Sequence, residues 1–306
     1  MYVITGATSN TGSLVAHHLL AAGQPVRVVG RSLERLAPFL RKGAEGVVAE
    51  PMDVAALTTA LQGATAAWIM LQPNYIPDSP DFAAYQAQVT SALTQAIAQS
   101  QLPYAVTLSS WGADQPTGTG PVGGLYRLEQ QLNALPGLQV RHLRAGYFME
   151  NTLAYLPSIL AHQQIVSPFR PDLPLPFVAT RDISRVAAET LLHLAFRGQS
   201  VGEIQGQRDL SSAEASAIVG RALGLPNLGY RQSSVAEFAT SLRTAGVSDN
   251  VTSLMAEVVT GINSGHLRTS QPRSAATTTS TSFEQFVIDT LAPAYQRALT
   301  AQPTAA

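Results

Sequence analysis

The sequence contains no cysteine and only one lysine, Lys42, among its 306 residues. The absence of cysteine excludes disulfides, thiolate nucleophiles and cysteine-ligated metal sites. Any mechanism that needs a lysine beside the reacting atoms would have to use Lys42, which precedes the third expected strand. These two absences exclude several enzyme mechanisms before any motif is considered.

Charged residues and long hydrophobic runs are also scarce. Only 13% of the residues are charged and the net charge is −1, so we expect no clustered basic face and no direct contact with nucleic acid. The sequence has no uncharged apolar run near the roughly 20 residues that span a bilayer, and no signal-peptide pattern at its start. We therefore expect a cytoplasmic globular protein without membrane contact.

Strand-like and helix-like segments alternate through the first half of the chain. Apolar runs at 1–6, 25–31, 46–50, 66–71, 104–110 and 138–146 predict six strands. Segments with helical spacing lie between them, at 13–23, 32–43, 54–63, 82–100 and 125–137. This alternation predicts an α/β fold with a doubly wound (Rossmann) parallel sheet, to which residues 201–206 can add a seventh strand.

The pattern changes after about residue 150. Residues 167–177 read as a proline-broken loop, 273–282 as a low-complexity loop, and 182–196 as a helix with Asp182 as its N-cap. Three further helices are expected to begin at capping boxes, namely Ser211…Glu214, Ser234…Glu237 and Ser282…Gln285. We predict an NAD(P)-binding domain at 1–150, to which about 176–206 return, and a smaller, mostly helical lobe for substrate or partner at 151–306.

The segment VITGATSNTG, residues 3–12, lies between the first strand and the first helix. Gly6 and Gly12 occupy the outer positions of a dinucleotide-binding turn, and Ser9 stands where a third glycine is expected. The Ser9 hydroxyl can donate to a phosphate oxygen, and the helix N-terminus offers free N–H groups. The predicted phosphate-binding residues are Gly6, Thr8, Ser9, Asn10, Thr11 and Gly12.

The end of the second strand indicates which nucleotide binds. An enzyme that prefers NAD(H) places an acidic residue there to hold the ribose 2′-hydroxyl. This chain has Gly30-Arg31-Ser32 instead. Arg31 can form charge-assisted hydrogen bonds with a 2′-phosphate, and Ser32 can donate another while capping the next helix. The prediction is NADP(H) rather than NAD(H), with Arg31 as an ordinary surface arginine in the alternative interpretation.

Four segments together resemble the NmrA-like group of atypical short-chain dehydrogenases/reductases, over nearly the whole chain. They are TGATSNTG, LEQQLNALPGLQVRHLRAGYFMEN, LPFVATRDISRVAA and the closing TSFEQFVIDTLAPAY. The resemblance implies NADPH-dependent reduction, as in the quinone reductases and triphenylmethane reductase of this group. The chain departs from the family pattern at Ser9, at Ala145 in place of proline, and at Glu50 in place of aspartate. Glu50 is expected near the adenine.

Glu129 matches an acidic residue of the second of these segments. In the alternative interpretation it has no special role, and it faces solvent or pairs with Arg127 or Arg144. The sequence pattern alone leaves the partner of Glu129 open.

Further cofactor contacts are expected at the ends of later strands and on the helix between them. The residues assigned to them are Leu71, Gln72, Pro73, Ser109, Gln130 and Gly146. Typical short-chain dehydrogenases have a catalytic tyrosine followed four residues later by a lysine. Here Tyr126 is followed by Gln130, and Lys42 cannot substitute. Alcohol dehydrogenase and epimerase chemistry that relies on this pair is therefore not expected.

Hydride transfer does not require the tyrosine/lysine pair when the acceptor stabilises the incoming electrons itself. Between Phe82 and Tyr126 the only charged residue is Asp114. The predicted substrate wall is Ser110, Trp111, Tyr126, Tyr147 and Phe148, which suits a flat, apolar aromatic or quinone-like acceptor. In the alternative interpretation these aromatic residues pack in the core or between lobes.

A second function is compatible with the same sequence. A protein that binds NAD(P) without turning it over could report the redox state to a regulatory protein partner, and it would not need the tyrosine/lysine pair. The sequence thus predicts an NADPH-dependent reductase of a quinone-like acceptor, or alternatively a non-catalytic redox sensor.

Overall fold

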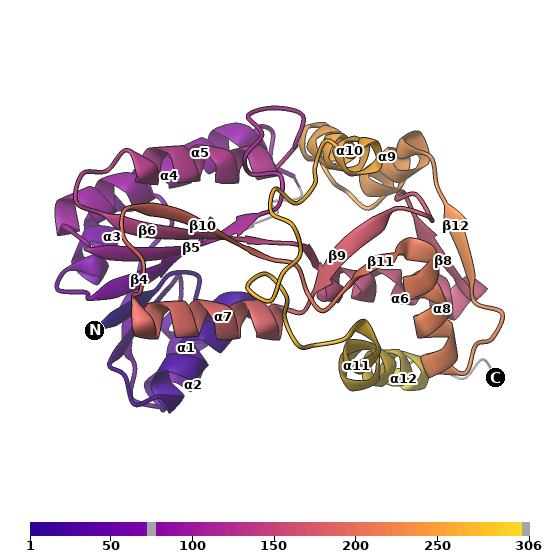
Figure 1. The fold of residues 1–306 in the computed structure, drawn as a ribbon, viewed down its shortest axis with the longest axis horizontal. Helices are drawn as coiled ribbons and strands as arrows, with labels where there is room; N and C mark the ends of the chain where they lie inside the picture. The colour runs from indigo at the N-terminus through magenta and orange to yellow at the C-terminus, as the bar shows by residue number, and fades with distance from the viewer. Residues whose placement is uncertain (72–77, 302–306) are drawn as a thin grey trace.

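A seven-stranded parallel sheet forms the larger part of the molecule (Figure 1). The structure, a computed structural model, describes residues 1–71 and 78–301. The strand order is β10-β6-β5-β4-β1-β2-β3. The strands are β1 (Tyr2–Ile4), β2 (Val26–Gly30), β3 (Glu45–Val48), β4 (Ala66–Ile69), β5 (Tyr104–Ser110), β6 (Gln139–Ala145) and β10 (Gln199–Ile204). The predicted doubly wound fold and its seventh strand are confirmed.

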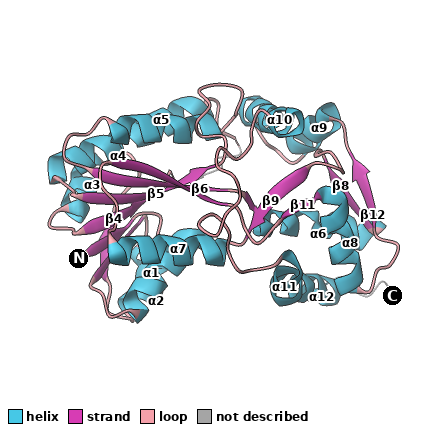
Figure 2. Ribbon diagram, viewed as in Figure 1, coloured by secondary structure: helices cyan, strands magenta, loops and turns pink. Residues whose placement is uncertain are grey.

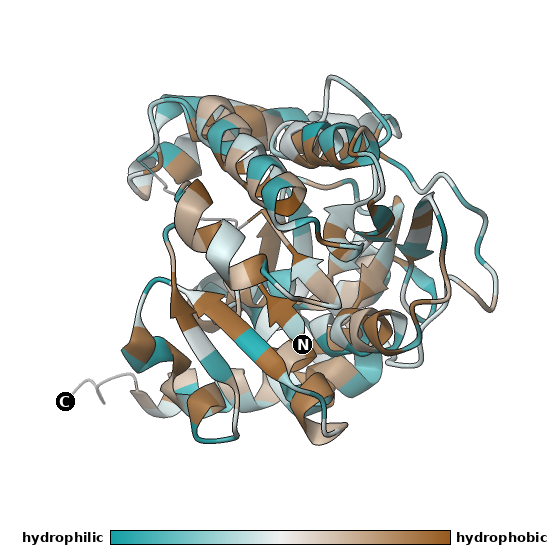
Figure 3. Cartoon of the chain, turned by 90° about the vertical axis from the view of Figure 1, so that its left-hand side faces the viewer, coloured by the Kyte–Doolittle hydropathy of each residue, from teal (hydrophilic) through white to brown (hydrophobic). Residues whose placement is uncertain are grey.

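Helices cover both faces of this sheet (Figures 1 and 3). One face carries α1 (Asn10–Ala21), α2 (Leu33–Leu40) and α7 (Thr180–His193), and the other α3 (Val54–Leu61), α4 (Phe82–Ser100) and α5 (Val122–Asn133). Each face has its own hydrophobic cluster, so the central strands are apolar on both sides. Trp68 of β4 faces the first cluster and its neighbour Ala67 the second.

A smaller C-terminal region, residues 147–178 and 207–301, packs around a third hydrophobic cluster. Its helices are η1 (Met149–Tyr155), α6 (Leu156–His162), α8 (Ser212–Leu223), α9 (Val235–Thr244), α10 (Asp249–Ser264), α11 (Phe283–Phe286), η2 (Val287–Leu291) and α12 (Ala292–Ala301). Two small sheets accompany them, with strand orders β11-β9-β7 and β12-β8 (Figure 2). Their strands are β7 (Tyr147–Phe148), β8 (Gln164–Ser167), β9 (Pro174–Val178), β11 (Asp209–Ser211) and β12 (Gly229–Gln232). Within the described residues, no helix is long and apolar enough to cross a bilayer.

The structure corrects the expected loop over 167–177. Residues 174–177 belong to β9, in which Leu175 and Phe177 are buried in the third cluster. The two prolines of this strand remove backbone donors, and the burial of the alternating apolar side chains offsets that loss. The prediction from sequence placed too much weight on the prolines.

Of the four helix caps expected after residue 150, two differ from the prediction. The N-cap of α7 is Ala179, not Asp182, which lies in the first turn and accepts a hydrogen bond from the Thr281 backbone N–H at 2.9 Å. Ser282 caps α11, but the Gln285 side chain donates to Asp289 instead of closing a capping box. The capping boxes at the starts of α8 and α9 are confirmed.

After α10 the chain crosses back to the large sheet as an extended segment, residues 265–282, which we call the strap (Figure 1). Its backbone exchanges hydrogen bonds with the end of β10, from Gln205 N to Thr277 O and from Thr279 N to Gly206 O. The low-complexity residues 273–282 therefore form a loop, as predicted, with defined partners.

Candidate cofactor and substrate site

The turn between β1 and α1, residues 6–12, forms what we call the phosphate cradle. Gly6 has a φ of +60°, and a Cβ on Gly12 would lie 2.4 Å from the Gly6 carbonyl oxygen. Real Cβ atoms do not approach a backbone oxygen so closely. The close packing of strand and helix therefore explains both glycines.

Ser9 has a different role from a third glycine. It is the N-cap of α1, with φ −82° and ψ 166°, a conformation that any residue adopts. Its hydroxyl accepts a hydrogen bond from Gly12 N at 3.0 Å and donates to the Met70 sulfur at 3.3 Å. The hydroxyl that was expected to donate to a phosphate is thus engaged in capping the helix.

The cradle nevertheless has the donors that a phosphate needs. No described residue accepts a hydrogen bond from the backbone N–H of Asn10 or Thr11. These two groups lie in the first turn of α1, where the helix dipole also favours an anion. The residues present therefore fit a dinucleotide pyrophosphate, and Thr8 borders the same turn.

Arg31, Ser32 and Glu50 lie at the carboxyl ends of β2 and β3, which are paired in register. Arg31 and Glu50 are both solvent-exposed, and no described residue forms a hydrogen bond or ion pair with the Arg31 side chain. Ser32 is the N-cap residue of α2, but its side chain makes no capping hydrogen bond. The predicted capping role is therefore wrong, and the hydroxyl is left available to a ligand.

Of the remaining predicted cofactor residues, Leu71, Ser109 and Gly146 lie at or near the carboxyl ends of β4, β5 and β6. Leu71 is buried, whereas Gln72 and Pro73 lie outside the described residues. A Cβ on Gly146 would lie 2.2 Å from the Pro176 carbonyl oxygen, so the approach of β9 fixes this glycine. Gln130 is exposed on α5.

Ser109 belongs to a buried polar cluster. Its hydroxyl donates to Glu129 at 2.5 Å, and Arg144 donates to both oxygens of the same carboxylate at 3.0 and 2.6 Å. Glu129 is only 2% exposed. Burial opposes the charged guanidinium, but the hydrogen bonds to Glu129 and the nearby carboxylates raise the pKa of Arg144 above its usual value. Of the partners that the sequence left open for Glu129, the structure thus shows Arg144.

The five residues of the predicted substrate wall lie in different environments. Trp111 is buried in the third cluster, which Tyr147 also contacts, whereas Phe148 packs against the cluster beneath α1 and α7. Ser110 and Tyr126 are half-buried, and no described residue forms a hydrogen bond with either hydroxyl. Ser110 and Tyr126 therefore remain the candidates for contact with an acceptor.

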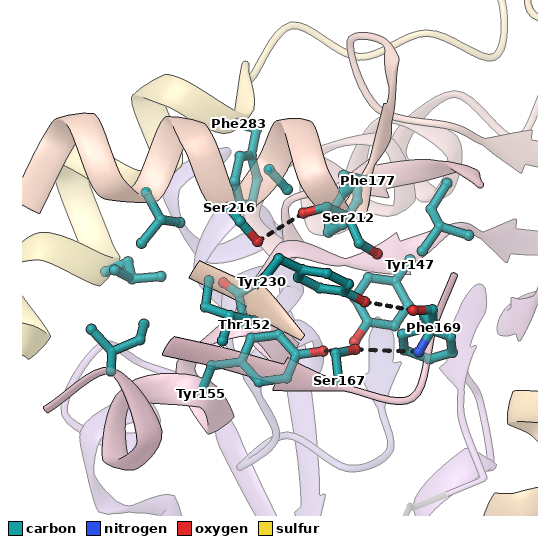
Figure 4. Close-up of a pocket in the computed structure, with 16 residues that line it drawn as sticks. Tyr147, Thr152, Tyr155, Ser167, Phe169, Phe177, Ser212, Ser216, Tyr230 and Phe283 are labelled. Carbon is teal, nitrogen blue, oxygen red and sulfur yellow. Dashed lines mark hydrogen bonds between the residues drawn. The ribbon is translucent and has the colours of Figure 1, made fainter. Parts of the chain in front are cut away.

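Tyr147 points into a small cavity of about 20 Å³ in the C-terminal region (Figure 4). Tyr155 and Tyr230 line the same cavity, where the Tyr155 hydroxyl pairs with Ser167 Oγ and the Tyr230 hydroxyl donates to Phe169 O. Burial raises the pKa of Tyr147 well above its usual value, and the adjacent Tyr155 adds to the increase. Tyr147 therefore stays protonated, and all three side chains contribute to the packing of this region.

The only lysine lies elsewhere. Lys42 follows α2, is exposed, and its Nζ lies 3.4 Å from His17 Nδ1 on α1. The helix position that carries lysine in typical short-chain dehydrogenases is Gln130. The structure thus supports the expectation that no lysine assists a tyrosine in this site.

Sequence reasoning missed what Glu150 does. Its carboxylate accepts hydrogen bonds from the Thr180 backbone N–H at 3.0 Å and from the Thr180 hydroxyl at 2.6 Å. The side chain thereby caps α7, whose own N-cap, Ala179, has no side-chain acceptor. Glu150 belongs to the FMEN motif and Thr180 to the FVATRDI motif, so the co-occurrence of the two motifs was the available signal.

Comparison with known proteins agrees with this site. A family model described as NAD(P)H-binding matches residues 6–145. The (4-alkanoyl-5-oxo-2,5-dihydrofuran-3-yl)methyl phosphate reductase of Streptomyces griseus is 30% identical over 226 residues, which cover 74% of this chain and 75% of that protein. The chain belongs to the NmrA-like family of atypical short-chain dehydrogenases/reductases. The glycine turn before α1 lies within the residues that the NAD(P)H-binding family model matches.

Two further proteins show how far the NmrA-like likeness extends. Quinone oxidoreductase 2 of Escherichia coli K12 is 26% identical over 270 residues, covering 87% of this chain and 90% of that protein. The structure of the Escherichia coli NADPH-dependent quinone oxidoreductase complexed with NADPH matches with a TM-score of 0.77 at 22% identity, over 98% of this chain and 100% of that one. NmrA, a negative transcriptional regulator in complex with NADP, matches with a TM-score of 0.72 at 15% identity, over 97% of each chain. At these identities the structural matches show a shared fold.

Proposed function

We propose that this chain is an NADP(H)-dependent reductase that passes a hydride directly to a conjugated, apolar acceptor such as a quinone. The proposal rests on two observations together: the Asn10 and Thr11 N–H groups of the cradle have no acceptor among the described residues, and α5 presents Gln130 instead of lysine. Such a site can hold the cofactor but does not assist a tyrosine acid. It therefore suits acceptors that delocalise the incoming electron pair themselves.

The chain's own residues would hold and orient the reactants. The N–H groups of Asn10 and Thr11 would bind the pyrophosphate, and Arg31 would bind the 2′-phosphate. When bound, NADPH supplies the hydride. The hydroxyl groups of Ser110 and Tyr126 are free to orient an acceptor oxygen, and the proton that completes the reduction of a quinone comes from water.

The charge of the acceptor follows from the partners of Arg144. The Streptomyces griseus relative is named for a phosphate ester, whose anion would need an unpaired cation near the reacting atoms. Arg144 is already paired with Glu129 and is only 9% exposed. We therefore favour a neutral acceptor, like the quinones for which the Escherichia coli relative is named.

The test is the oxidation of NADPH by the purified protein in the presence of quinones, triphenylmethane dyes and aromatic carbonyls. We expect turnover with at least one quinone, faster with NADPH than with NADH. The phosphate ester of the Streptomyces griseus reductase serves as the anionic comparison. Absence of turnover with the whole set, by a protein that binds NADPH, would overturn the reductase proposal.

A second candidate function is a regulatory protein that binds NAD(P) without turning it over. The observation that favours it is the packing of Trp111, Tyr147 and Phe148 in hydrophobic clusters, which leaves fewer side chains to contact an acceptor. The fold shared with the regulator NmrA agrees with this alternative. Binding of both redox forms without turnover of any acceptor would support it over the reductase.

A further inference from the structure

Three carboxylates gather around one guanidinium at the carboxyl ends of β5, β6 and β10. Arg144 binds both oxygens of Glu129, and its Nη1 lies 3.9 Å from Asp114 Oδ1. Glu203 stands opposite Arg144 in the register of β10 and β6 and acts on it electrostatically. We call these four residues the acidic cluster, because negative charges outnumber the positive one.

The two buried glutamates accept hydrogen bonds from several donors. Glu129 accepts from Arg144 and from the Ser109 hydroxyl. Glu203, which is 2% exposed, accepts from the Ser270 backbone N–H at 2.6 Å and from the Gln271 backbone N–H at 3.0 Å. Every one of these partners donates, so both carboxylates act as acceptors throughout.

Among the described residues, no basic side chain other than Arg144 forms an ion pair with these carboxylates. Burial lowers the pKa of His142, which lies close to Glu129, to about 4, so its ring is neutral near neutral pH. Arg127 directs its guanidinium toward Ala83 O on α4, and Arg268 is exposed to solvent. Solvent screens an exposed charge more strongly than a buried one.

The acidic cluster lies within electrostatic range of the cofactor site. Neighbouring strands are about 4.8 Å apart, so β6 lies about 10 Å across the sheet from β4. Ligands of doubly wound sheets bind at the switch point, here the crevice between the carboxyl ends of β1 and β4. At about 10 Å and an effective dielectric constant of about 20, one unit charge changes an affinity roughly tenfold.

We propose that the acidic cluster sets the preference of this protein between the two redox forms of its cofactor. The nicotinamide ring is positively charged in NADP⁺ and neutral in NADPH, so an excess of nearby negative charge stabilises the oxidised form. The same charge favours departure of the hydride, because positive charge develops on the ring as the hydride leaves. The inference rests on the proposed function only in that the cofactor must bind in the phosphate cradle.

The test is calorimetric titration with NADP⁺ and with NADPH, which needs no acceptor. For each protein, the dissociation constant for NADPH is divided by that for NADP⁺. We expect this ratio to fall about threefold in Asp114→Asn and up to about tenfold in Glu129→Gln. The control is Glu45→Gln, which removes a carboxylate that pairs with Arg27 on the far edge of the sheet. In Glu45→Gln the ratio of the two dissociation constants should equal that of the wild type.

A ratio that stays within about twofold of the wild-type value in Asp114→Asn and Glu129→Gln would overturn the inference, as would an equal fall in Glu45→Gln. Thermal unfolding establishes that each variant is folded. If Glu129→Gln does not fold, the partly exposed Asp114→Asn decides alone. If the wild type binds neither NADP⁺ nor NADPH, the proposed function fails as well. If it binds both tightly but the substitutions leave the ratio unchanged, only the inference about the acidic cluster fails.

Discussion

At the scale of single residues, Ser9 and Gly12 have different roles at the start of α1, which a third glycine in place of Ser9 could not reproduce. Ser9 stabilises the start of α1 through its hydroxyl, and Gly12 allows the helix to approach the Gly6 carbonyl. The serine therefore caps the helix, while the backbone N–H groups that follow it are the donors that we propose for a phosphate. A glycine at position 9 is not required by the backbone conformation.

These different roles predict that substitution of Gly12 is costly, whereas substitution of Ser9 is tolerated. Gly12→Ala should lower the free energy of unfolding by about 1–3 kcal/mol and abolish cofactor binding, because its Cβ collides with Gly6 O. Ser9→Gly should cost only a few tenths of a kcal/mol, and Ser9→Ala about 1 kcal/mol, through loss of the cap. Urea unfolding checks the stabilities. A Gly12→Ala protein that is as stable as the wild type would contradict the close packing.

The second prediction at the residue scale concerns Arg31, which we propose to bind the 2′-phosphate. Arg31→Ala should weaken NADPH binding roughly 10- to 100-fold, because a charge-assisted hydrogen bond is worth about 1.5–3 kcal/mol. Binding of NADH, which lacks the 2′-phosphate, should change little. Calorimetry measures both, with Arg35→Ala as the control, since Arg35 is also exposed and lies one turn into α2. An equal loss for NADPH and NADH would show that Arg31 does not read the 2′-phosphate.

At the scale of secondary structure, α7 joins the large sheet to the C-terminal region. Its first residue, Thr180, is held by Glu150, and its Ser184 hydroxyl donates to Thr11 O in the first turn of α1. In the same turn of α7, Asp182 holds the strap at Thr281. Helix α7 thus contacts the phosphate cradle, the first turn of η1 and the strap.

The Glu150 cap gives the third prediction. Glu150→Ala should lower the free energy of unfolding by about 1–3 kcal/mol, because it leaves the Thr180 N–H and hydroxyl without their acceptor. The matched control is Glu189→Ala, which removes only the exposed partner of Arg185 later in the same helix and should cost less than about 0.5 kcal/mol. Urea unfolding of both variants distinguishes the cap from a general loss of charge, and equal costs would count against it.

The elements of the large sheet were the easiest to predict from sequence. The bounds of β5 and α4 agree with the prediction, because buried parallel strands are continuous apolar runs and long helices keep their period. The cradle glycines were also predictable, since they serve a local turn. The roles of Asp182 and Glu150 were not, because their partners lie 99 and 30 residues away in the chain.

The substrate side was harder to predict for a related reason. Tyr147 and Phe148 are adjacent in sequence but belong to different hydrophobic clusters, because successive residues of a strand face opposite sides. Sequence placed both beyond the sixth strand but could not say which face each would take. Only the packing of β9 beside β7 decides that.

At the scale of the whole molecule, stability should depend on pH through His142. Burial lowers its pKa from 6.5 to about 4, and its ring lies between Thr107 and Asn133. Between about pH 4 and pH 6.5, His142 binds more protons in the unfolded chain than in the folded one. The stabilisation that comes from its uncharged ring is therefore complete above about pH 6.5 and is lost as the pH falls toward about 4. The free energy of unfolding should fall by about 2 kcal/mol from about pH 7 to about pH 5.

Urea unfolding at several pH values measures this slope. His142→Gln, which cannot titrate, should lose most of it, whereas His162→Gln, on the C-terminal α6, should keep it. A slope that survives His142→Gln would assign the pH dependence to other groups.

The chain passes repeatedly between the large sheet and the C-terminal region: out at β7, back at α7 and β10, out at β11, back along the strap and out again at α11. The C-terminal region is therefore not a module with one junction. A chimera that exchanges this region between two relatives would need several crossover points, and each would have to preserve a contact such as that between the strap and β10. Gradual change of side chains at the mouth of the sheet is the simpler evolutionary route to a new acceptor.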